Sequence, residues 1–170
     1  MKQLSLIAVA FLNIALLAFA FVDNEKGSHD TDARTKQLVM KVLDDYMSTF
    51  NAHDLKGWEG TYQFPHYRLA SGKLNTLEKA GLRDSSKVFA ALEKSGWHHS
   101  KWDHRNIIQA SGDKIHVDTQ FSRYGADGTK IGSYESLYIL TLENGKWGVK
   151  MRSSYAEQFL YSHQSPPHEK

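Results

Sequence analysis

The sequence predicts an α+β fold, in which N-terminal helices pack in the concave side of a curved, mainly antiparallel sheet and make the domain cone-like. Two observations lead to this fold class. Apolar residues recur at helical spacing before Gly96, and they alternate with polar residues after it. Short turns separate the four alternating segments, as in sheets built from hairpins. With 170 residues, 41% of them hydrophobic, the chain is long enough for one domain with a substantial core.

Three helices are expected in the first part of this domain. Residues 32–50 predict an amphipathic helix, because apolar side chains recur there every three or four positions. Asp54 can cap a second, short helix, since its side chain can accept a hydrogen bond from a free backbone N–H. Asp84 or Ser85 can cap a third helix, which Gly96 ends.

Four strands follow, and their turns set the register between them. Asn144-Gly145 is the residue pair favoured in two-residue type I′ turns, and counting outward from it places Tyr134 opposite Tyr155. The other two turns place Thr119 opposite both Tyr134 and His104, which lie on its two neighbouring strands. The expected strands are 100–109, 114–124, 130–142 and 146–155.

All three registers bring the same alternate residues to one face of the sheet. Because a one-residue slip would turn every side chain to the other face, this agreement is informative. The face is apolar at one end and polar at the other, as in a small-molecule pocket. Its apolar end holds Ile108, Ile115, Val117, Tyr138, Leu140, Trp147, Val149 and Met151. Its polar end holds Trp102, His104, Asn106, Thr119, Tyr134, Ser136, Ser153 and Tyr155, with Phe121 and Arg123 beyond it.

This arrangement resembles the nuclear transport factor 2-like superfamily, which includes ketosteroid isomerase, scytalone dehydratase and the polyketide cyclases. The resemblance covers roughly residues 35–157 and rests on two stretches, Phe50-Asn51-Ala52-His53-Asp54 and the hairpin from Tyr134 to Trp147. It implies a pocket between the sheet and the helices, and often a dimer formed through the outer face of the sheet.

Two functional classes fit such a pocket. His104 is a candidate catalytic acid or base, because histidine titrates near neutral pH, and Tyr134 or Tyr155 could polarise a substrate oxygen. These residues would serve a lyase or isomerase of the dehydratase or cyclase type. A ketosteroid-isomerase-like site instead needs a carboxylate inside the cone, and the acids of these strands fall on the outer face: Asp103, Asp118 and Glu135. Binding of a small molecule, with no assigned reaction, is therefore the first hypothesis, and whether the protein is an enzyme stays open.

The predicted ligand contacts surround the polar end of the face. His66 follows Pro65 in an extended segment that should cross the pocket mouth, and Arg123 at the rim could bind an anionic group. The ligand-binding candidates are His66, Trp102, Asn106, Thr119, Arg123, Ser136 and Ser153. No metal site is expected, because His98 and His99 are adjacent on a strand and should point to opposite faces. No cofactor is expected either.

Composition narrows the possible partners. The formal net charge is only +2 and no basic stripe is visible, which argues against nucleic-acid binding. The absence of cysteine excludes disulfides and thiolate catalysis. The outer face carries three aliphatic residues, Ile131, Leu137 and Ile139, which favours a homodimer through that face. Polar and charged residues are expected beside them: Arg105, His116, Asp118, Glu135 and Arg152. A third hypothesis is accordingly a dimeric accessory domain with a filled cone.

The first residues are typical of a secretory signal peptide. Lys2 precedes an apolar run, and Ala18-Phe19-Ala20 has the small-x-small pattern of a cleavage site. The protein is therefore expected to be periplasmic or secreted, and to contact a membrane only if this segment stays as an anchor. We expect a signal peptide, a linker, one nuclear transport factor 2-like domain and a flexible tail over residues 1–20, 21–31, 32–157 and 158–170.

Overall fold

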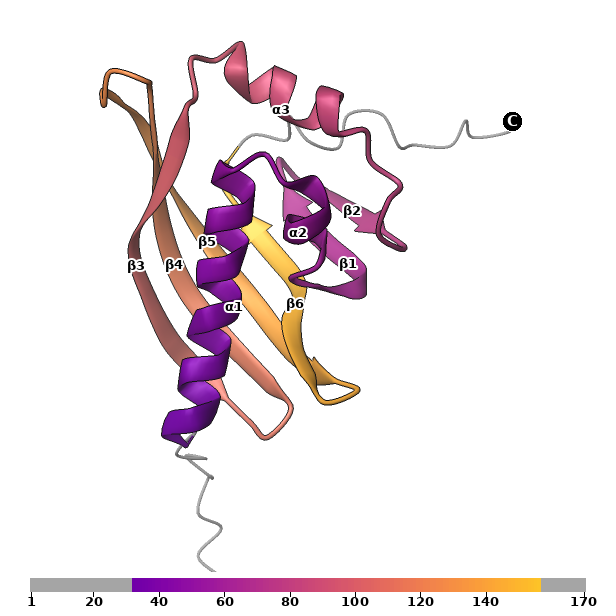
Figure 1. The fold of residues 1–170 in the computed structure, drawn as a ribbon. Helices are drawn as coiled ribbons and strands as arrows, with labels where there is room; N and C mark the ends of the chain where they lie inside the picture. Colours follow the sequence, from indigo (N-terminus) through magenta and orange to yellow (C-terminus); the bar gives the residue numbers. More distant parts are fainter. Residues whose placement is uncertain (1–31, 157–170) are drawn as a thin grey trace, which may run out of the picture.

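Helix α1 (Ala33–Asn51) crosses the concave side of a six-stranded sheet (Figure 1). The computed structural model describes residues 32–156, so the expected signal peptide, linker and tail lie outside the described residues. The fold class predicted from the sequence is confirmed. After α1 the elements are α2 (Leu55–Glu59), β1 (Tyr62–Ala70), β2 (Lys73–Leu77), α3 (Ser85–Glu93), β3 (His99–Ala110), β4 (Lys114–Tyr124), β5 (Lys130–Glu143) and β6 (Lys146–Ser154).

The strands are ordered β2-β1-β6-β5-β4-β3. β1 runs parallel to β6, and all other neighbouring pairs are antiparallel. The four strands expected after Gly96 correspond to β3, β4, β5 and β6, and the extended segment around Pro65 is β1. Strand β2 was not predicted, although Ser71-Gly72 forms a two-residue turn with positive φ at both positions.

Each helix begins at an aspartate cap; the caps at Asp54 and Asp84 are as predicted, and the cap at Asp32 was not predicted. The side chains of Asp32, Asp54 and Asp84 accept hydrogen bonds from backbone N–H groups two or three residues further on, at 2.7, 2.9 and 3.0 Å. These bonds satisfy donors that the first helical turn leaves free. The caps fix where α1 and α2 begin, and hence which stripe of each helix faces the sheet.

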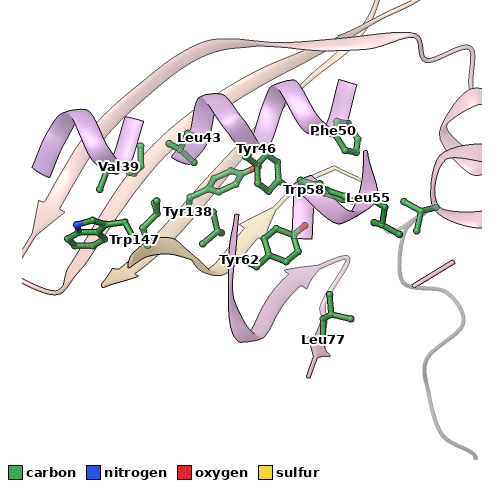
Figure 2. Packing of buried hydrophobic residues seen from close by; sticks show 14 of the residues in the cluster. Val39, Leu43, Tyr46, Phe50, Leu55, Trp58, Tyr62, Leu77, Tyr138 and Trp147 are labelled. Carbon is green, nitrogen blue, oxygen red and sulfur yellow. The ribbon is translucent and has the colours of Figure 1, made fainter. Parts of the chain in front are cut away.

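The buried stripe of α1 packs directly on the inner face of the sheet. Val39, Leu43, Tyr46 and Phe50 lie on this stripe at helical spacing. Figure 2 shows Tyr46 against Tyr138 of β5, with Trp58 of α2 beside them; the Tyr46 and Tyr138 rings meet edge to face at 5.5 Å. Aromatic side chains therefore pack between the helix and the sheet at this point.

Strand β6 contains a bulge, and the side chains after it point to the faces opposite to those predicted. The Asn144-Gly145 turn and the pairs next to it are as predicted, from Glu143 opposite Lys146 to Leu140 opposite Val149. Lys150 is then an extra residue, so that Ile139 pairs with Met151. A bulge shifts the pairing by one residue and so exchanges the two faces. The predicted pairs Tyr138–Met151, Ser136–Ser153 and Tyr134–Tyr155 are therefore wrong, and Arg152 and Ser154 point inward.

Strand β3 contains two similar bulges. Trp102 pairs with Phe121 but His104 pairs with Gln120, which makes Asp103 the extra residue. From there to the second bulge at Ile108, the faces are opposite to those predicted: Arg105 and Ile107 point inward. The β4–β5 register differs from the prediction by two residues, with Thr119 opposite Ser136 instead of Tyr134. An even shift keeps the same residues inside, so the predicted faces of these two strands hold.

Candidate functional site

A cavity lies between α1 and the inner face of the sheet, and we call it the α1 cavity. About 20 Å³ of it can take the centre of a water-sized molecule. Such a volume accommodates about one water molecule. The lining residues are Tyr46, Met47, Phe50, Ser100, Phe121, Arg123, Tyr138 and Arg152.

Arg152 joins the helix to the sheet at this cavity. Its Nη1 donates to the phenol oxygens of Tyr46 at 2.5 Å and Tyr138 at 3.1 Å. Burial raises the pKa of the Tyr138 phenol well above its ordinary value, against the opposing effect of the Arg152 charge. Tyr138 is therefore a neutral hydroxyl at physiological pH, and the charge here belongs to the guanidinium.

Arg123 brings a second cation to the α1 cavity from β4. The residue is 5% exposed. Its guanidinium carbon lies 4.8 Å from the ring centroid of Tyr134 and 5.9 Å from that of Phe121. Gly132 makes room for this stacking, since a Cβ at that position would lie 3.0 Å from the Tyr134 hydroxyl. Burial, aided by the nearby Arg152 charge, lowers the pKa of Arg123. An arginine nevertheless keeps its proton in a protein, so this is a buried positive charge.

Several predicted site residues do lie on the inner face. Trp102 donates its indole N–H to the Leu43 carbonyl oxygen at 3.3 Å, and its ring centroid lies 5.6 Å from that of Tyr138. Thr119 donates to the Ser136 carbonyl oxygen, and the Ser136 hydroxyl donates to that of Ser154, both at 2.9 Å. Arg123 is the one ligand-binding candidate of the sequence analysis that lines the α1 cavity; the hydroxyls form hydrogen bonds within the sheet.

Four predicted site residues do not lie inside the cone, and the bulges are the reason. The same bulges turn Ile108 and Met151 away from the predicted apolar end of the face. His104 and Asn106 lie on the outer face, where His104 Nε2 is 3.1 Å from Asp118 Oδ2 and the side chain is 39% exposed. Ser153 also points outward, and Tyr155 is 82% exposed. His104 and Tyr155 therefore do not meet Tyr134 inside the cone, and the predicted acid–base arrangement has no geometric basis.

His66 is buried within the sheet instead of crossing a pocket mouth. It is 2% exposed, and its ring stacks on Tyr62 with centroids 3.9 Å apart. Nδ1 lies 2.9 Å from the Val149 carbonyl oxygen, and since a carbonyl only accepts, Nδ1 carries the hydrogen. Burial lowers the pKa of His66 to about 3. The imidazole is therefore neutral at physiological pH and fixes β1 to β6.

The α1 cavity is also lined by residues that were not predicted for the site. Tyr46, Met47 and Phe50 come from α1, and Ser100 comes from the start of β3. Tyr138 was assigned to the apolar end of the face, and Arg152 to the outer side. The aromatic and methionine pattern of α1 predicts only a buried stripe, so nothing in it distinguishes a cavity lining from a filled core.

A second, more open depression lies where α1, α3 and β3 approach one another. Its lining residues are Asn51, Ala52, His53, Glu93, Trp97, His98 and His99. His98 and His99 do not point apart as expected, because His98 precedes β3 and the two Nδ1 atoms lie 3.1 Å apart. Within residues 32–156, however, no three or more histidine, cysteine or acidic side chains are grouped so that they could hold a metal ion.

The fold and the site together define a class of protein: an α+β cone with a small, cation-bearing cavity under its first helix. In the part of the chain that the structure describes, no helix has the length and apolar character needed to cross a membrane. A family model described as NTF2-like protein (DUF6841) matches residues 35–156. The chain belongs to this family of NTF2-like proteins, which confirms the resemblance inferred from the sequence. No curated protein matches the chain.

Solved structures share this fold at low sequence identity. A protein of unknown function with a cystatin-like fold from Nostoc punctiforme PCC 73102 aligns with a TM-score of 0.61 and 15% identity, over 74% of this chain and 93% of that one. An NTF2-like protein of unknown function from Pseudomonas putida KT2440 aligns with a TM-score of 0.56 and 12% identity, over 75% of this chain and 89% of that one. A ketosteroid isomerase-like protein from Erwinia carotovora atroseptica SCRI1043 aligns with a TM-score of 0.54 and 16% identity, over 70% of this chain and 93% of that one. At these identities the similarity shows the fold alone.

Proposed function

We propose that this protein is an exported domain that binds a small molecule in the α1 cavity. The observation that carries the proposal is the clustering of two cations and two phenols, Arg123, Arg152, Tyr46 and Tyr138, around space that protein atoms do not fill. Burying polar and charged groups is costly, and a core needed only for stability gains little from gathering them at a void. A bound molecule would repay that cost.

Met47 is the side chain through which the cavity would open. It lines the cavity from α1 and is only partly buried. Methionine is unbranched and has several rotatable bonds, so it can move aside at small cost. A ligand larger than the present space would therefore displace Met47, while the rings of Phe50 and Phe121 remain as its apolar walls.

Binding is tested by NMR with the ¹⁵N-labelled protein and a mixed library of charged and neutral fragments. We expect saturable shifts of Tyr138, Phe121 and other residues that line the α1 cavity. Met47→Trp, which fills the cavity from the helix, should weaken the best fragment by about tenfold or more, equivalent to about 1.4 kcal/mol. Leu38→Trp, at an exposed position on the same helix, is the matched control and should leave binding unchanged. Shifts confined to other surfaces would contradict the proposal.

A second candidate function, a dimeric accessory domain with a filled cone, is favoured by Trp102. This side chain packs between α1 and the sheet, with its ring centroid 6.4 Å from Tyr46 and 6.2 Å from Phe121, and so occupies part of the cone. The partner would be a second copy that covers the outer face, where Ile131 is exposed. A dimer that binds no fragment in the NMR experiment would support this function over the first.

A further inference from the structure

The charge around the α1 cavity is not balanced by any acidic side chain that lines it. The lining residues with a formal charge are Arg123 and Arg152, and the rest are aromatic, hydroxyl or thioether groups. Among residues 32–156, Glu59 is the one buried acidic residue. Its carboxylate accepts from Arg83 Nε at 2.8 Å and from the Gly81 N–H at 2.6 Å, so it is already paired at α2. The lining of the cavity therefore carries two positively charged side chains and no acidic one.

Arg123 is a buried cation of this cavity for which no described residue supplies an anionic partner. Its Nε has no hydrogen-bond partner. None of the ion pairs within residues 32–156 includes it. The rings of Tyr134 and Phe121 offset part of the cost of burying its charge. A buried cation is normally paired with an anion as well. Residues 32–156 supply no such anion for Arg123.

We propose that the molecule bound in the α1 cavity carries a carboxylate that pairs with Arg123; this inference rests on the proposed binding function. A planar carboxylate matches the donor fork of a guanidinium and can accept two hydrogen bonds from it. The phenols of Tyr46, on α1, and Tyr138, on β5, and the second cation, Arg152, also line the cavity.

The other lining residues indicate which kind of group the carboxylate of the ligand is attached to. Met47, Phe50 and Phe121 present thioether and ring surfaces, which favour an aliphatic or aromatic group over a polar one. The narrow space favours one carboxylate over a bulkier or doubly charged group. The ligand class is therefore a small monocarboxylic acid with an apolar body.

The test compares benzoate with benzamide, which has nearly the same shape but no charge. Both are titrated into the ¹⁵N-labelled wild-type protein, and cavity resonances are followed. Benzoate should bind at least about tenfold more tightly, because a hydrogen bond to a charged group is stronger than a neutral one. Arg123→Gln should remove this preference, and Arg123→Lys should keep part of it. Arg34→Gln makes the same change of charge at an exposed position of α1 and should have no effect.

The two compounds can be compared on the wild-type protein alone, so the result does not depend on a variant that folds. Equal affinity for benzoate and benzamide, with both shifting residues of the α1 cavity, would overturn the carboxylate inference and leave the binding function standing. Unchanged benzoate affinity in folded Arg123→Gln would overturn the role of Arg123. If neither compound nor any library fragment bound in the cavity, the inference and the proposed function would both be overturned.

Discussion

Replacing Glu59 with glutamine should destabilise the domain by about 3–5 kcal/mol, the usual cost of removing one partner from a buried ion pair. Glu59 is 2% exposed, and both of its oxygens are used, one by Arg83 Nε and the other by the Gly81 N–H. The Arg83 guanidinium carbon lies 4.5 Å from the ring centroid of Trp58. These contacts tie the segment before α3 to α2, and glutamine cannot neutralise the Arg83 charge. Urea unfolding followed by circular dichroism measures the change.

Two further variants separate this pair from ordinary surface charge. Asp45→Asn removes an exposed ion pair with Lys41 on α1, and it should cost no more than about 0.5 kcal/mol. The double variant Glu59→Leu with Arg83→Met removes both buried charges and should recover much of the loss. If Glu59→Gln cost no more than Asp45→Asn, the buried pair would not have the structural role described here.

The free energy of unfolding should fall as the pH falls below about 6.5, because His66 stays neutral in the folded protein. Burial lowers the pKa of His66 to about 3 from 6.5, so between these values the unfolded chain binds a proton that the folded protein does not. Stability from this residue is complete above pH 6.5 and is lost at about 1.4 kcal/mol per pH unit on the way down. Denaturant unfolding at pH 7 and pH 5 should therefore differ by roughly 2 kcal/mol from His66 alone.

His66→Phe isolates this contribution. Phenylalanine can keep the stacking on Tyr62 but loses the Nδ1–H donor to Val149, so the variant should be less stable at pH 7. The deficit should shrink at pH 5, because the variant has no proton to exclude at this position. The comparison is needed because burial also lowers the pKa of His116, which adds to the slope in both proteins. Parallel stability curves for the two proteins would contradict a neutral, buried His66.

The fold could be predicted because its signals are local. The aspartate caps, the Asn144-Gly145 turn and the change of period after Gly96 each act over a few residues. The Ser71-Gly72 turn is a signal of the same kind, and it could have revealed β2. The parallel pairing of β1 with β6 joins segments far apart in the chain, so no local pattern announces it.

The site was predicted less well, because a single extra residue in a strand turns all the following side chains to the opposite face of the sheet. Asp103 and Lys150 shift the pairing by one residue, and neither is a glycine, a proline or part of a turn that would mark a bulge in the sequence. Counting from a correct turn is therefore reliable only up to the bulge. This is why Arg123, on the bulge-free part of β4, was placed correctly, while Arg152 and His104 were assigned to the wrong faces.

The most direct test of a ligand site in the α1 cavity is a crystal structure of the protein soaked with 4-bromobenzoate, whose bromine is located by anomalous scattering. We expect the bromine beside Phe50 or Met47, inside the cone, and the carboxylate in hydrogen-bond contact with the Arg123 guanidinium. An α1 cavity without bound compound, with bromine only on the outer surface of the domain, would contradict the binding site.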